Sequence, residues 1–278
     1  MLKDRKVDLF TDNKNADLYK DDFIFSTIYT DKKQVAKNKY DLIIIDSYST
    51  RSIHVKADIA DLTPFVGMFG YYNGPEVNRV LFSYHQMNHL LGYVYNEDEL
   101  NKIAKTSISI SRRDKEIIQK NKLPSNFVAL AIGGEWDYRT YNKWDFVIEK
   151  LISQENDLNI ILVGSDNAID SARVIMDKFS KYKVYSYVAK LTFNQTAEII
   201  SRAKILLCCD GGLMHSANAV NTPIVALFAR LTEEMQLTES ISSFSLFDKD
   251  NVNNILVEDI LNKYKEASIF VHNHPLDG

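Results

Sequence analysis

The chain has 278 residues, of which 45% are hydrophobic and 25% are charged, and its formal net charge is −4. This is the composition of an ordinary globular protein, and the length suits two domains of usual size better than one large domain. A net charge so close to neutrality excludes a surface that holds nucleic acid or an anionic membrane by charge alone.

Short apolar runs rich in β-branched residues alternate with helical stretches along much of the chain. The runs that predict strands are residues 7–10, 41–45, 65–69, 127–132, 159–163, 205–209 and 223–228. Helices are predicted over residues 144–154, 168–179, 192–203 and 214–220. Such an alternation is typical of α/β folds with a parallel sheet.

A polar, helical segment divides the chain near its middle. Residues 97–121 form this connector, and Pro124 with its polar neighbours interrupts the chain before the next strand. We therefore predict two α/β domains, residues 1–121 and 122–278, with a cleft between them. Ligands of such folds bind at the carboxyl ends of the strands.

One motif carries most of the chemical information. An apolar strand ends in Asp210-Gly211-Gly212-Leu213-Met214-His215, and a helix of small residues follows. Glycines let a backbone approach a ligand closely, and the free N–H groups and positive dipole end of a helix start favour an anion. The motif therefore indicates a phosphate site. Its alternative is a tight turn with no ligand, because short glycine motifs are common.

The order of the residues around this motif resembles a known family. Asp210 to His215, an alanine-rich helix and the following Thr222-Pro-Ile-Val-Ala-Leu-Phe228 resemble the signature of the heptosyltransferases, glycosyltransferase family 9. The Gly133-Gly134 pair with the segment from Arg139 to Trp144 agrees with the family in order and spacing. The resemblance implies a GT-B-like pair of Rossmann-like domains facing across a cleft. It also implies inverting, metal-independent transfer of a heptose or related sugar, with ADP-heptose as donor and a lipopolysaccharide core or other glycan as acceptor.

The resemblance assigns donor-binding roles to residues of the second domain. They are Thr140, Asp166, Asp210, Gly211, Gly212, Leu213 and His215. The family commonly has a lysine two residues before its tryptophan, and that position is Asn142 here. Arg139 or Lys143 must then supply the positive charge for the diphosphate. The alternatives are solvated helix-start charges at Arg139 and Lys143 and a helix cap at Asp166.

The first domain resembles the acceptor side of the family. Residues 40–46 match its strand ending in an acid, and the following Arg51 and Ser52 are implied to bind acceptor. The family takes its general base from a Gly-Asp turn after its first strand, and nothing similar precedes Val7. We therefore expect a domain that starts late, Asp46 as the substitute base or else a turn cap, and donor binding with little turnover. The alternative function is a non-catalytic nucleotide-sugar binding module. A nucleotide-sugar isomerase would need its own acid and base pair.

The remaining expectations concern cofactors, partners and location. Neither a cofactor nor a metal is expected, since Asp248-Lys249-Asp250, which spells an Asp-x-Asp metal motif, lies in a polar turn far from Asp210 in sequence. The expected partners are a nucleotide-diphosphate sugar and a glycan acceptor, with no nucleic acid. Cys208 and Cys209 are adjacent, which disulfide geometry rarely permits, so the chain is predicted to be cytoplasmic and reduced. Peripheral contact with the cytoplasmic face of the inner membrane stays open.

Overall fold

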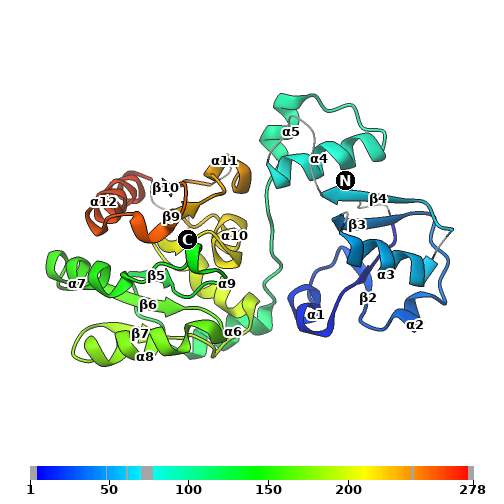
Figure 1. Cartoon of the computed structure of the whole chain (residues 1–278). Helices are drawn as coiled ribbons and strands as arrows, with labels where there is room; N and C mark the ends of the chain where they lie inside the picture. The colour runs from blue at the N-terminus through cyan, green and yellow to red at the C-terminus, as the bar shows by residue number, and fades with distance from the viewer. Residues whose placement is uncertain (1–4, 48, 61, 70–77, 239–240, 275–278) are drawn as a thin grey trace. The chain divides into compact units, whose positions relative to one another are not determined.

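The structure is a computed structural model that describes residues 5–47, 49–60, 62–69, 78–238 and 241–274. The chain divides into two compact units, Met1–Ala104 and Lys105–Gly278 (Figure 1). Among the helices of the described residues, none combines the length and the apolar character needed to cross a bilayer.

The first unit has short parallel strands. Its described strands are β1 (Val7–Phe10), β2 (Phe25–Tyr29), β3 (Ile43–Ser47) and β4 (Phe65–Phe69). Its described helices are α1 (Asn13–Tyr19), α2 (Lys32–Val35), α3 (Thr50–Ala60), α4 (Arg79–Leu90) and α5 (Glu97–Ile103). β1 pairs in parallel with β2, and β3 pairs in parallel with β4. β1 and β4 lie where the sequence predicts strands, β3 begins and ends later, and β2 was not predicted because polar residues interrupt its apolar ones.

The second unit is built on a six-stranded parallel sheet with the order β10-β9-β8-β5-β6-β7 in the described residues. The strands are β5 (Phe127–Ala131), β6 (Asn159–Val163), β7 (Val184–Ser186), β8 (Leu206–Cys209), β9 (Ile224–Ala229) and β10 (Leu246–Asp248). The α-helices are α6 (Arg112–Lys120), α7 (Trp144–Gln154), α8 (Ile169–Lys178), α9 (Phe193–Ser201), α10 (Gly212–Val220), α11 (Glu233–Gln236) and α12 (Val257–Asn273). The 3-10 helices are η1 (Asp137–Arg139), η2 (Asp166–Ala168) and η3 (Val252–Asn254). This strand order is that of the doubly wound dinucleotide-binding fold, so the predicted α/β class is confirmed.

Both faces of this sheet are covered, as alternate residues of β5 show. Val128 and Leu130 belong to one apolar cluster, and Phe127 and Ala129 belong to another. Side chains from α7, α8 and α12 complete the first cluster, and side chains from α6, α9 and α10 complete the second. Strands buried on both faces have nearly continuous apolar sequences, which explains why β5, β6, β8 and β9 were predictable. The short strands β7 and β10 lie at the two edges of this sheet, and they were not predicted.

The predicted domain change after residue 121 differs from the division between Ala104 and Lys105. α6 packs with the second unit, where the Gln195 side-chain amide donates to the Asp114 carboxylate at 2.9 Å. The Asn194 side-chain amide donates to the Ser109 carbonyl at 2.8 Å. Asp114 and Asn194 are both buried. These long-range polar contacts assign α6 to the second unit, whereas its polar sequence suggested only a connector.

Candidate functional site

The strand order of the second unit reverses between β5 and β8. These strands are neighbours, yet the α-helices that follow them, α7 and α10, contribute to opposite apolar clusters. In doubly wound sheets, ligands bind outside the carboxyl ends of the strands at such a switch point. The predicted donor residues of segments 133–143 and 210–215 follow these two ends.

Arg139 and Asp210 meet across the switch point. A guanidinium nitrogen of Arg139 lies 3.5 Å from a carboxylate oxygen of Asp210, and the two side chains are 20% and 3% exposed. Another guanidinium nitrogen lies 3.4 Å from the Glu135 carboxylate. Because a buried carboxylate needs a compensating charge, Asp210 fixes the Arg139 guanidinium beside the ends of β5 and β8.

The start of α10 offers backbone donors beside this pair. Gly211 is the N-cap residue, with an extended backbone. The amides of Gly211, Gly212 and Leu213 donate no hydrogen bond to any acceptor in the described part of the chain. A β-carbon on Gly211 would meet open space, whereas one on Gly212 would lie 3.4 Å from the ring of Phe193. The N–H groups of this helix start can therefore be approached by an anion, and Phe193, which the sequence did not single out, borders them.

The glycine pair after β5 is required by close packing. Gly133 has a φ of +92°, and a β-carbon there would come within 2.8 Å of the Ala168 β-carbon. A β-carbon on Gly134 would overlap the hydroxyl of Thr140. The Asn167 side-chain amide donates to the Gly134 carbonyl at 2.8 Å. The turn after β6 therefore clamps the glycine loop.

Lys143 is engaged by η3. Its ammonium donates to the carbonyl of Asn253 at 2.6 Å. The Asn253 side chain accepts from the Asn142 amide and donates to the Thr140 carbonyl, both at 2.8 Å. η3 thus holds the segment that precedes α7. Of the two cations that the sequence left open, the structure puts Arg139 beside Asp210 and ties Lys143 to η3.

The other predicted donor residues differ in their surroundings. The Thr140 hydroxyl donates to the Trp136 carbonyl at 2.9 Å. The Asp166 carboxylate is exposed and makes neither a capping bond nor any other hydrogen bond within the described residues. His215 is half-buried in the first turns of α10, and Leu213 packs partly against the second apolar cluster. Thr140 therefore has a local structural contact, and Asp166 points a charge toward solvent.

The predicted acceptor-side residues lie around the end of β3 in the first unit. The Ser52 hydroxyl, on α3, donates to the Asp46 carboxylate over 3.5 Å. The Ser49 hydroxyl accepts a hydrogen bond from the Ser52 amide at 3.1 Å and so caps the start of α3. Burial and then the charge of Asp46 raise the pKa of Tyr19. The structure thus brings Asp46 and Ser52 together, and the neighbouring Arg51 is exposed.

Asp248 organises a turn. Its carboxylate accepts from the amides of Asp250 and Asn251, both at 2.9 Å, and from the side chain of Asn254 at 3.0 Å. The amide of Asn251, followed by that of Asp250, holds the pKa of Asp248 below its ordinary value. Among the described residues, no three His, Cys, Asp or Glu side chains cluster as metal ligands do.

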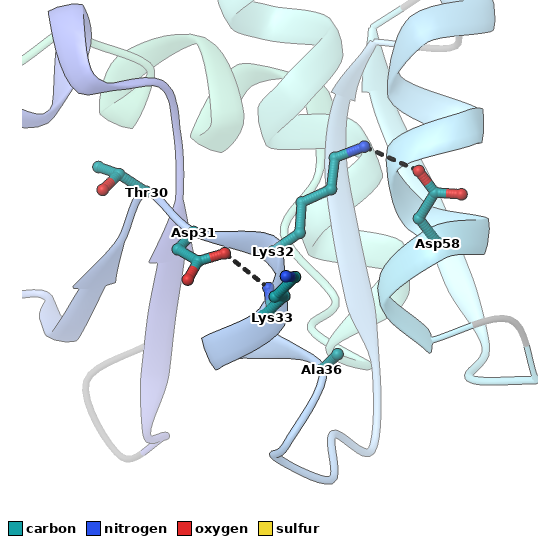
Figure 2. Close-up of a pocket in the computed structure, with 6 residues that line it drawn as sticks. All are labelled: Thr30, Asp31, Lys32, Lys33, Ala36 and Asp58. Atoms are coloured by element: carbon teal, nitrogen blue, oxygen red, sulfur yellow. Dashed lines mark hydrogen bonds and ion pairs between the residues drawn. The ribbon is translucent and has the colours of Figure 1, made fainter.

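A surface hollow of about 540 Å³ lies in the first unit beside α2 and α3. Figure 2 shows Lys32 reaching toward Asp58, and its ammonium is 2.7 Å from that carboxylate. Asp31 accepts from the Lys33 amide at 2.9 Å and caps α2. The lining residues include none of those predicted to bind donor or acceptor. The hollow is therefore separate from the candidate site.

Comparison with known proteins gives the family and the fold. Residues 76–251 match the model of a family described as glycosyltransferase family 9 (heptosyltransferase). A family 9 glycosyl transferase from Veillonella parvula DSM 2008 superposes with a TM-score of 0.77 at 13% identity, covering 95% of this chain and 88% of that one. The E. coli ADP-heptose lps heptosyltransferase II superposes with a TM-score of 0.73 at 13% identity, and the match covers 97% of this chain and 91% of that one. E. coli heptosyltransferase WaaC with ADP superposes with a TM-score of 0.70 at 13% identity, and the match covers 96% of this chain and 91% of that one. A search of curated proteins finds no match.

The fold and the family match together define a glycosyltransferase. The chain belongs to glycosyltransferase family 9, the heptosyltransferase family, as its resemblance predicted. The solved structures, which are GT-B glycosyltransferases, share its α/β fold. At 13% sequence identity, this similarity shows a common fold and nothing more about function.

Proposed function

We propose that the second unit binds a nucleoside diphosphate sugar at the carboxyl ends of β5 and β8. The observation that carries this proposal is the Arg139–Asp210 pair beside the open amides at the start of α10. A diphosphate would accept hydrogen bonds from these amides and from the guanidinium. Because the guanidinium and the positive dipole end of α10 both attract an anion, we propose that the diphosphate binds without a divalent metal.

The donor is proposed to be ADP-heptose and the acceptor a lipopolysaccharide core or a related glycan. Two similar structures support this choice, one described as an ADP-heptose lps heptosyltransferase and the other as holding ADP. An acceptor of this kind is membrane-bound, so the reaction belongs at the cytoplasmic face of the inner membrane.

The proposed reaction inverts the sugar's anomeric centre. An acceptor hydroxyl oxygen forms a bond to the anomeric carbon while the bond from that carbon to the diphosphate oxygen breaks. The hydroxyl proton passes to the Asp46 carboxylate, which we propose as the base because it is exposed at the end of β3. Arg51 and Ser52 would contact the acceptor. The departing diphosphate keeps the bonding electrons, and Arg139 and the α10 amides stabilise its charge.

Two experiments test this function. Calorimetric titration with ADP, UDP and adenosine, in EDTA and in magnesium, should show diphosphate binding that does not need the metal. No binding of any nucleoside diphosphate at millimolar concentration would refute the donor site. Heptose transfer from ADP-heptose to a truncated core acceptor tests the reaction, and donor binding without turnover would favour the non-catalytic module instead.

A further inference from the structure

Arg230 follows β9 at the sheet edge where the proposed donor site lies. β9 pairs in parallel with β8 in the register Cys209↔Leu227, so both strands end at the same edge of the sheet and β9 extends two residues further. The φ of Arg230 is +66°, and the Leu231 amide donates to the Ala229 carbonyl at 2.8 Å. This is a γ-turn of the strained kind, centred on a residue that has a β-carbon.

The Arg230 side chain stacks on the segment that carries Arg139. Its guanidinium lies 3.9 Å from the centre of the Tyr138 ring, and Tyr138 directly precedes Arg139 in η1. Arg230 is exposed, and no carboxylate or other acceptor in the described part of the chain pairs with its guanidinium. One face of the guanidinium is therefore held by the ring while its N–H donors stay open to a ligand.

The proposed donor site needs this charge. Arg139 already faces the carboxylates of Asp210 and Glu135, at 3.5 and 3.4 Å. The Lys143 ammonium donates to the Asn253 carbonyl. A diphosphate would bring more than one negative charge close to the buried Asp210 carboxylate. Its binding therefore requires a positive group that is not already neutralised.

We propose that Arg230 is a donor-binding residue that contacts the diphosphate beside Arg139. This inference rests on the proposed function of the second unit. A glycine would adopt the backbone of residue 230 without strain, whereas an arginine retains it. Strained non-glycine residues of this kind cluster at active sites and ligand-binding loops.

The variant Arg230→Gly separates a ligand role from a structural one. Glycine relieves the backbone and removes the guanidinium, so the melting temperature without ligand should be unchanged or higher. The dissociation constant for ADP, or for UDP if that nucleotide is preferred, should rise about ten-fold or more. Binding of the matching nucleoside should not change. If Arg230 only braces Tyr138, the variant will melt lower and bind the diphosphate as the wild type does, which overturns the inference.

Lys122→Gly is a matched control. Lys122 is also an exposed cation at positive φ, +49°, but it precedes β5 at the opposite end of the strand. Its replacement should leave diphosphate binding unchanged, and an equal loss in both variants would show a general charge effect and overturn the inference. If the wild type binds neither ADP nor UDP, the proposed function itself fails. If the wild type binds and Arg230→Gly binds equally well, only the role of Arg230 fails.

Discussion

The two units bury their strands to different degrees. Every residue of β5 is buried, whereas every residue of β1 is only half-buried and Ile44 of β3 is 38% exposed. The first unit also exposes large apolar side chains almost completely, as at Phe23 and Leu62. A sheet covered on both faces gives the donor residues a rigid base, while a two-stranded sheet supports Asp46 and Ser52. We therefore expect the second unit to contribute most of the folding stability and to bind the donor. We expect the first unit to bind the acceptor and to supply the base.

The largest expected effect tests the chemistry assigned to the first unit. Asp46→Asn removes the proposed base but keeps the side chain's size and its contact with Ser52. Turnover should fall about a hundred- to ten-thousand-fold, while ADP affinity stays the same, because positioned bases act on the reaction and not on donor binding. Rates of heptose transfer and ADP titration measure the two quantities. A variant that retains wild-type turnover would remove Asp46 from the mechanism.

Equal truncations in β6 and β3 test the difference in burial. Ile161 is fully buried and Ile44 is 38% exposed. Ile161→Ala should lower the free energy of unfolding by about 2–5 kcal/mol, since it loses apolar burial and leaves a cavity. Ile44→Ala should cost less than about 1 kcal/mol, because much of its surface is already in water. Denaturant unfolding measures both, and equal losses would contradict the comparison.

A pair of glycines with positive φ extends this test to the loops. Gly133 has a φ of +92° and no room for a β-carbon, while Gly92 has a φ of +70° and open space around it. Gly92→Ala should cost about 1–2 kcal/mol of stability from the backbone alone. Gly133→Ala should cost about 1–3 kcal/mol more, because Ala168 must move. Thermal unfolding distinguishes the two, and a smaller loss at Gly133 would show that the loop is not clamped.

Within the second unit, alanine variants distinguish the two cations near the strand ends. Arg139→Ala should weaken ADP binding by about 1.5–3 kcal/mol and leave adenosine binding nearly unchanged, because adenosine offers no anion. Lys143→Ala should weaken ADP binding less, since its ammonium donates to the Asn253 carbonyl. Calorimetric titration measures both constants. A larger loss at Lys143 would move the diphosphate toward η3.

The smallest expected effects come from exposed ion pairs, one in each unit. The hydrogen bond from Lys32, and then its charge, lowers the pKa of Asp58, and Lys183 acts in the same way on Asp157. In each pair the carboxyl group has a lower pKa in the folded chain than in the unfolded chain. Each pair therefore stabilises the fold at pH values above the unfolded pKa, and this stabilisation is lost as the pH falls through the folded pKa. Lys32→Ala should raise the pKa of Asp58 toward its ordinary value and barely change the melting temperature. NMR titration of the carboxyl carbons measures this pKa. If the pKa of Asp58 is the same in the variant and the wild type, the pair does not form in solution.

Much of the second unit could be predicted from local sequence. α7 lies over the predicted residues, and β5, β6, β8 and β9 stand out because strands buried on both faces are apolar throughout. The helix start after Asp210 could be predicted for a similar reason, since it depends on neighbouring residues, and the phosphate site that its glycines indicate stays a prediction. The edge strands β7 and β10 escaped prediction because they are short, and β2 because its apolar residues are interrupted.

Only the tertiary structure decided which groups meet at the ends of β5 and β8. The sequence left Arg139 and Lys143 open, and their difference depends on Asp210 and Asn253, which lie far along the chain from both. Arg230 had no motif to mark it, because its stacking on Tyr138 joins β9 to η1. Local patterns record the backbone and burial that a residue requires of its neighbours. Charge pairing between distant segments depends on the strand order of the sheet, which brings those segments together only in the folded chain.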